Sequence, residues 1–199
     1  MWKRLAALLV GTLALMAAGS AGAHPHVWVD AKATLIFQKG KITAIRMHWT
    51  FDPLFTTLVM SEHDKDKNKT FSPAEVDDLE KNAFENLKNH SYFTHLRLDG
   101  KVAKVSRVKG FKPSYAKGKL IYEFTILLDR PIDPLKTRFG VGVYDESFYV
   151  AVEFKKNNPI AVTGTGSAGC SHQIVVDKKN PFYSGMIFPR IATLRCAGS

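Results

Sequence analysis

Strict alternation of apolar and polar residues near the start of the chain is the feature that most constrains its fold. Residues 27–37 place apolar side chains at the odd positions, and residues 45–52 repeat this pattern after a turn. A period of two residues is typical of strands that bury one face. The two runs therefore predict a β-hairpin, closed by a three-residue loop at Gln38-Lys39-Gly40.

The rest of the chain predicts two helices followed by further strands. Residues 53–60 have apolar side chains at helical spacing, and a second helix is expected from about Pro73 to Lys88, where Ser72 and Glu75 form a capping box. Short apolar runs predict strands at Leu96–Leu98, Val102–Val108, Leu120–Leu128, Phe139–Tyr144, Phe148–Phe154 and Ile174–Val176. The expected class is α+β: a mainly antiparallel, sandwich-like β core in one domain, with an EF-hand-like helix-loop-helix inserted at about residues 53–90.

The first 23 residues are predicted to be a secretory signal peptide. Lys3 and Arg4 precede an apolar run, and Ala21-Gly22-Ala23 supplies the small residues that signal peptidase needs. Cleavage is expected after Ala23, so the mature domain covers residues 24–199. Export through the Sec pathway predicts a periplasmic location and argues against a cytosolic enzyme.

The chain is strongly basic, with 28 Lys+Arg against 18 Asp+Glu. Export excludes nucleic acid as the expected partner, and the lysines are scattered without interleaved aromatic residues. We therefore interpret the charge as a solvated basic surface, which could make peripheral contact with an anionic membrane surface.

The chain has two cysteines, Cys170 and Cys196. In an exported protein they most simply form one disulfide, closing a loop of about 26 residues. The alternative is a thiolate metal site that uses Cys170 with His172.

Residues 64–75, between the two predicted helices, follow the ligand spacing of an EF-hand calcium loop. Oxygen ligands are expected from Asp64, Asp66, Asn68, Thr70 (through its backbone oxygen), Ser72 and Glu75. Lys69 occupies the position where glycine normally permits positive φ, and Lys65 and Lys67 add positive charge beside the ion. Two interpretations remain: a weak calcium site, or a solvated loop that caps a helix.

Histidines and carboxylates are expected to gather at the start of the mature chain. After cleavage, His24 is the first residue and offers both its α-amine and its imidazole; His26 follows. The predicted hairpin places Asp30 opposite His48. It also places His26 opposite Asp52, with cross-strand Cβ atoms about 5 Å apart on the exposed face. Imidazole with carboxylate suits Zn²⁺, Ni²⁺, Co²⁺ or Cu²⁺. The alternative is an ordinary polar sheet face. Structural roles are expected for the other histidines, His63, His90, His95 and His172.

Several motifs are shared with a known group of proteins. They are His24-Pro25-His26-Val27-Trp28-Val29-Asp30, Trp49-Thr50-Phe51-Asp52, the loop Asp64–Glu75, Tyr92-Phe93-Thr94-His95-Leu96, and Val143-Tyr144-Asp145 followed by Phe148-Tyr149-Val150. With these motifs the mature chain resembles the DUF1007 family of exported bacterial proteins over essentially its whole length. The resemblance implies a periplasmic component associated with nickel/cobalt-type permeases. Lys69 departs from the glycine typical of the loop, and a single β core does not match a two-lobed solute-binding protein.

The expected function is therefore a non-enzymatic periplasmic accessory protein. It would bind a transition metal near His24 and His26 and pass it to or from a membrane permease. A calcium-stabilised β interaction module without a transition metal is the second interpretation. The third is a histidine-brace copper enzyme, which requires a flat aromatic substrate face; only Trp28 and Trp49 are nearby, and Trp49 is expected to face the core.

Overall fold

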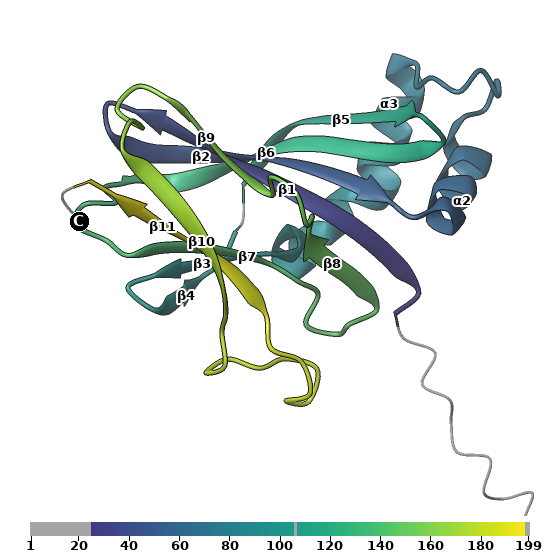
Figure 1. Ribbon diagram of the computed structural model, residues 1–199. Helices are drawn as coiled ribbons and strands as arrows, with labels where there is room; N and C mark the ends of the chain where they lie inside the picture. The colour runs from purple at the N-terminus through teal and green to yellow at the C-terminus, as the bar shows by residue number, and fades with distance from the viewer. Residues whose placement is uncertain (1–24, 106, 198–199) are drawn as a thin grey trace, which may run out of the picture.

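The computed structural model describes residues 25–105 and 107–197. The predicted signal peptide and His24 lie outside these described residues. Within them, two β-sheets are stacked and a group of helices lies at one end of the upper sheet (Figure 1). The predicted α+β class with a sandwich-like β core is confirmed.

The larger sheet has six strands among the described residues, in the order β5-β6-β2-β1, with β8 and β9 both pairing with the free edge of β1. These strands are β1 (Val27–Gln38), β2 (Lys41–Phe51), β5 (Val108–Ala116), β6 (Lys119–Ile132), β8 (Val150–Phe154) and β9 (Ile160–Gly164). Both β8 and β9 run parallel to β1, β8 along its first half and β9 along its second. The antiparallel expectation therefore holds for the rest of this sheet and fails at one edge.

The smaller sheet has five strands among the described residues, in the order β10-β11-β7-β3-β4, all antiparallel. They are β3 (Thr94–Leu98), β4 (Lys101–Ala103), β7 (Phe139–Val143), β10 (Cys170–Val176) and β11 (Arg190–Cys196). The sequence patterns did not predict β9 or β11, and the strand expected at 102–108 is divided between β4 and β5.

The helical insertion contains α2 (Pro53–His63), α3 (Pro73–Leu79), the π-helical turn η1 (Glu80–Phe84) and the 3₁₀ segment η2 (Glu85–Phe93). The regular helix expected to run to Lys88 therefore ends early. Ser91, Tyr92 and Phe93 have positive φ angles of 53°, 49° and 47°, which reverse the chain direction. This reversal buries Tyr92 and Phe93 in the core, and their burial offsets the cost of the left-handed backbone.

The register of the β1–β2 hairpin differs from the predicted one. Asp30 is paired with Thr50 and His48 with Lys32, so the predicted pairing of Asp30 with His48 was wrong. The reason is the turn: Lys39 and Gly40 both have positive φ, as a two-residue type I′ turn requires, and a bulge follows. The faces are nevertheless as expected, because the register moved by an even number of residues.

The core lies between the sheets and continues under the helical insertion. Trp49 is fully buried, with Phe124 at 4.9 Å edge-to-face and Phe93 stacked at 5.9 Å between ring centroids. Phe84 stacks on Phe111 at 4.1 Å and thereby attaches the insertion to β5. Trp49 faces the core as expected.

Cys170 and Cys196 form a disulfide between β10 and β11, as predicted. The alternative thiolate metal site is therefore excluded. Disulfides are typical of proteins outside the reducing cytoplasm, so this bond fits an extracytoplasmic protein.

No helix among the described residues is both long enough and apolar enough to cross a membrane.

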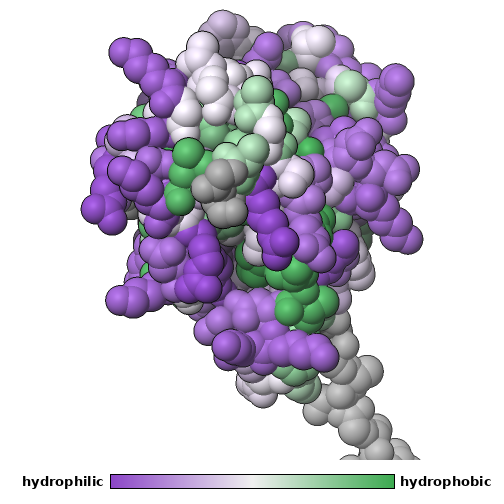
Figure 2. Space-filling model, turned by 60° about the vertical axis from the view of Figure 1, so that its left-hand side comes forward, coloured by the Kyte–Doolittle hydropathy of each residue, from purple (hydrophilic) through white to green (hydrophobic). Residues whose placement is uncertain are grey.

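Most of the surface seen in Figure 2 is hydrophilic, with hydrophobic side chains gathered in its middle and lower part. Over the described residues, the large exposed apolar side chains include Trp28 beside α2, Leu54 and Leu58 on α2, and Met186 and Phe188 between β10 and β11. Exposed apolar residues of this kind are common on folded proteins and by themselves indicate no partner.

Candidate metal centres

The loop 64–75 brings three carboxylates together between α2 and α3. Oxygens of Asp64, Asp66 and Glu75 lie within 4.8 Å of one another, and this is the one such group of three or more acidic, histidine or cysteine ligands in residues 25–105 and 107–197. Asp64 and Glu75 are buried, and Asp66 is exposed. Carboxylate oxygens grouped in this way suit Ca²⁺, which takes about six to eight oxygen ligands in all.

Side-chain hydrogen bonds to the backbone shape the first half of this loop. Asp64 accepts from the backbone N–H of Asn68 at 3.1 Å and of Lys69 at 3.0 Å. Asp66 also accepts from the Asn68 N–H, and Asn68 accepts from the N–H of Thr70 at 2.7 Å. Lys69 has a φ of 64°, so it adopts the left-handed conformation despite its side chain. The missing glycine therefore costs roughly 1–2 kcal/mol of backbone strain and does not prevent the turn.

Glu75 closes the loop and also begins α3. One carboxylate oxygen accepts from the backbone N–H of Lys65 at 2.6 Å; the other accepts from the N–H and the hydroxyl of Ser72, both at 2.8 Å. The predicted capping box is present. These hydrogen bonds, those from Ser72 above all, lower the pKa of Glu75. The carboxylate is therefore ionised at neutral pH, as a calcium ligand must be.

A second contact joins the two helices outside the loop. His63, at the end of α2, lies with Nδ1 2.7 Å from a carboxylate oxygen of Asp78 on α3. The hydrogen bond from His63 lowers the pKa of Asp78. This pairing gives His63 the structural role expected for it.

Replacing Glu75 by Gln should remove most of the stabilisation that calcium provides. Lone loops with added lysines belong to the weak range, with Kd about 10⁻⁴–10⁻³ M, so about 2 mM calcium should stabilise the wild type by roughly 0.6–1.8 kcal/mol. Thermal melts with calcium and with a chelator measure this difference. Asp77→Asn is the matched control, because Asp77 is an exposed carboxylate of α3 that pairs with Lys81 outside the loop. A wild-type melting curve that does not respond to calcium would contradict the prediction.

The residues predicted to bind a transition metal are spread along one face of the larger sheet. Both carboxylate oxygens of Asp52 already accept hydrogen bonds from the backbone. One oxygen accepts from the N–H groups of Leu54 and Phe55 and so caps α2. The other accepts from the N–H of Trp28 at 2.9 Å. The backbone N–H of Asp52 donates to the carbonyl of Trp28, so Asp52 lies beside Trp28 and not opposite His26. The predicted pairing of His26 with Asp52 was therefore wrong.

His48 has a partner that the sequence did not reveal. Its Nδ1 lies 3.2 Å from a carboxylate oxygen of Glu123 on β6, and its Nε2 lies 3.5 Å from the Thr50 hydroxyl. Glu123 comes to this position because β6 pairs with β2 directly opposite His48. A carboxylate in this position could orient the imidazole of His48.

The exposed end of β1 carries the remaining predicted ligands. His26 is exposed, and its ring lies 4.6 Å from that of Tyr149. Asp30 is paired with Glu153 on β8, and both carboxylates line a hollow of about 230 Å³ beside Trp28. Sequence analysis missed Glu153, because a parallel pairing between distant segments leaves no local signal.

The structure supports structural roles for two of the other histidines. His63 is described above. His95 is buried, with Nε2 3.0 Å from the carbonyl oxygen of Tyr144 and its ring stacked on that tyrosine at 3.8 Å. Burial lowers the pKa of His95, so the neutral imidazole is favoured in the folded protein.

Two proteins with similar sequences are themselves described as uncharacterised. An uncharacterised 15.5 kDa protein of Spirochaeta aurantia is 33% identical over 134 residues, which are 67% of this chain and 95% of that protein. An uncharacterised protein of Haemophilus influenzae is 24% identical over 170 residues, 83% of this chain and 80% of that protein. Residues 9–184 match the family described as "Protein of unknown function (DUF1007)". The chain therefore belongs to the DUF1007 family.

Proposed function

We propose that this chain is a periplasmic metal-binding accessory protein of a transition-metal transport system, of the nickel/cobalt type or for zinc or copper. The observation that carries the proposal is the composition of the exposed end of β1. There Asp30 lies beside Glu153 on the exposed sheet face, and His26, just before β1 and about 13 Å along the strand from Asp30, is two residues from the predicted mature N-terminus at His24.

The chemistry of these groups suits a borderline transition metal. Imidazole nitrogen and carboxylate oxygen are ligands for Zn²⁺, Ni²⁺, Co²⁺ and Cu²⁺. A processed chain would add the α-amine and imidazole of His24 to the exposed ring of His26. Because this end of the sheet is exposed, a metal held there could be transferred to a partner, and the partner we propose is a membrane permease. The role is non-enzymatic: metal is bound and handed over.

Two observations support the periplasmic location. The Cys170–Cys196 disulfide is typical of an oxidising compartment. The first 23 residues have the composition of a Sec signal peptide with a cleavage site after Ala23.

Removing the imidazole of His26 should weaken transition-metal binding by at least about tenfold, since it deletes a ligand of the proposed site. Titration calorimetry of the processed protein with Ni²⁺, Co²⁺, Zn²⁺ and Cu²⁺ measures the effect for His26→Ala, Asp30→Asn and Glu153→Gln. Affinity should also fall as pH decreases through about 6.5, where histidine side chains ordinarily become protonated.

The matched control is His172→Ala, because His172 is also exposed but lies on β10 of the other sheet. It should bind like the wild type. If His26→Ala and His172→Ala both bind all four metals as the wild type does, the end of β1 is not a metal site.

A second candidate function is a calcium-stabilised β interaction module without a transition metal. The grouping of Asp64, Asp66 and Glu75 favours it. Calcium-dependent melting together with no saturable transition-metal binding would support this module and reject the transport role.

A further inference from the structure

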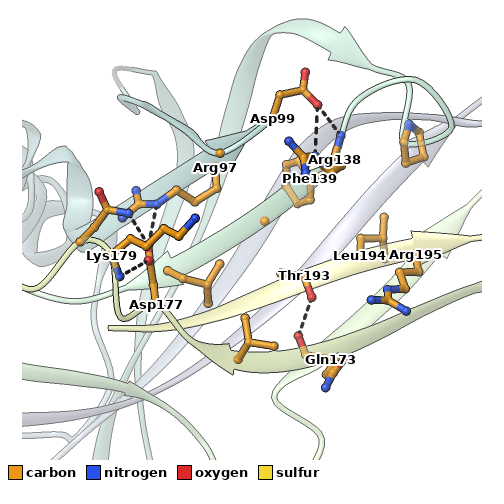
Figure 3. A pocket seen from close by; sticks show the side chains of 16 residues that line it. Arg97, Asp99, Arg138, Phe139, Gln173, Asp177, Lys179, Thr193, Leu194 and Arg195 are labelled. Carbon is orange, nitrogen blue, oxygen red and sulfur yellow. Dashed lines mark hydrogen bonds and ion pairs between the residues drawn. The ribbon is translucent and has the colours of Figure 1, made fainter. Parts of the chain in front are cut away.

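The outer face of the smaller sheet carries a cavity of about 790 Å³, away from both candidate metal centres (Figure 3). One row of paired residues crosses it, from Arg97 on β3 through Gly140 on β7 and Thr193 on β11 to Gln173 on β10. A volume of this size is in the range of small-molecule sites.

Gly140 leaves the middle of the cavity floor without a side chain. Val141 belongs to the core between the sheets, so its neighbour Gly140 faces outward. A Cβ atom at Gly140 would lie 2.9 Å from the side chain of Ile191 and 3.4 Å from the Cβ of Arg97. Only glycine therefore allows these two side chains to approach β7 so closely. The floor is apolar at Ile191 and Val175, which also line the cavity.

Positive charge predominates around this floor. The charged side chains that line the cavity are Arg97, Arg138, Lys179, Arg195, Asp99 and Asp177. Both carboxylates already have donors: Asp177 accepts from Arg97 Nε at 3.3 Å and from Asn180 at 2.8 Å, and Asp99 accepts from the backbone N–H of Arg138 at 2.9 Å. The cations in excess therefore favour an anion in the cavity.

The cations stand at separate places along the cavity. Figure 3 shows Arg97 and Lys179 at one end, close to Asp177, and Arg195 at the opposite end. Between them lie Thr193 and the apolar floor. A ligand that satisfies both ends needs two acidic groups separated by a spacer.

Arg97 has a hydrogen-bonding nitrogen that the described residues leave unsatisfied. The residue is 7% exposed. Its Nε donates to Asp177 and its Nη2 donates to the Tyr144 hydroxyl at 3.1 Å, but its Nη1 is buried with no partner among the described residues. A buried donor without a partner is costly. Because this nitrogen has almost no accessible surface, a ligand in the cavity cannot contact it. The cation that can meet a ligand at this end is the exposed Lys179 beside Arg97 (Figure 3).

We propose that this cavity binds a small organic anion with two carboxylate groups, one held at Lys179 and the other at Arg195. The apolar floor receives the spacer between the two groups. Because lysine and arginine side chains ordinarily stay charged in this range, the binding should not change between about pH 6 and pH 8. The proposed metal site should respond to the same change in pH, so the two sites are distinguishable.

The test is titration calorimetry of the processed protein at low ionic strength with succinate, adipate and suberate, and with acetate and inorganic phosphate for comparison. At least one dicarboxylate should bind saturably, and about tenfold or more tightly than acetate or phosphate. Arg195→Gln and Lys179→Gln should each weaken that binding by about tenfold; both residues are exposed, so the variants keep the buried Arg97–Asp177 pair.

Lys117→Gln is the matched control, because Lys117 is an exposed cation in the β5–β6 turn of the other sheet. It should bind the dicarboxylate like the wild type. The proposal is overturned if no dicarboxylate binds saturably, if acetate or phosphate binds as tightly, or if Lys117→Gln weakens binding as much as Arg195→Gln does.

Discussion

Replacing both Cys170 and Cys196 by alanine is expected to lower the free energy of unfolding by roughly 3–4 kcal/mol. The two residues are separated by 26 positions, and closing a loop of that length restricts the unfolded chain by about this amount in the chain-entropy model. The disulfide also joins β10 to β11, next to the cavity on the smaller sheet. Urea unfolding of the wild type and the double variant measures the difference.

Reduced wild-type protein is the control for this experiment. With a reductant present, its unfolding midpoint should move to that of the double variant, because both then lack the same cross-link. A double variant within about 1 kcal/mol of the oxidised wild type would show that the disulfide contributes little to stability.

The second large effect concerns Asp52, which was predicted to be a metal ligand. Its carboxylate accepts from three backbone N–H groups and so joins the start of α2 to β1. Asp52→Ala should lower stability by about 2 kcal/mol without any metal present, since it removes an N-cap and a charge-assisted hydrogen bond. Asp52→Asn should cost less, because asparagine is also a good N-cap.

Denaturant unfolding in a chelating buffer isolates this structural role. Asp30→Ala is the matched control: Asp30 is an exposed carboxylate of β1, and its loss should change stability by less than about 0.5 kcal/mol. If Asp52→Ala were as stable as Asp30→Ala, the hydrogen bonds of Asp52 would not contribute to stability. The prediction that Asp52 is a metal ligand would then be favoured again.

Local sequence patterns predicted those elements of the fold that depend on interactions between residues close in the sequence. The alternation in residues 27–37 and 45–52 identified β1 and β2 together with their buried faces. A strand with one buried and one solvent-exposed face must alternate apolar and polar side chains. Ser72 and Glu75 identified the start of α3, because capping satisfies backbone groups within four residues. The disulfide was predicted from two cysteines in a chain that is expected to be exported.

The remaining features depend on contacts between distant segments. The residues at 38–40 did not decide whether the β1–β2 turn has two or three residues, and no pattern predicted the bulge that follows it. The shorter turn and the bulge together moved Asp30 from His48 to Thr50. The carboxylates that now accompany the histidines, Glu123 and Glu153, arrive through pairing with β6 and β8. Strand pairing at such separations is a tertiary property, which no local pattern records.

The cavity on the smaller sheet was missed for the same reason. Its walls come from four strands that are far apart in the sequence, and its floor depends on Gly140, which resembles any other glycine in an apolar run. Arg97 was a sequence signal that could have pointed to this region. A charged residue within the short apolar strand 96–98 is rarely buried unless it is paired.

The most direct test of the proposed function is native mass spectrometry of the processed protein, compared with a form that carries one extra residue before His24. Both are exposed to Ni²⁺, Co²⁺, Zn²⁺ and Cu²⁺. One added residue moves the α-amine by about 3.5 Å and leaves His26, Asp30 and Glu153 in place. We predict that the processed protein binds one transition-metal ion and that the extended form loses most of this binding. If neither form retains any of the four metals, the proposed transport role is contradicted.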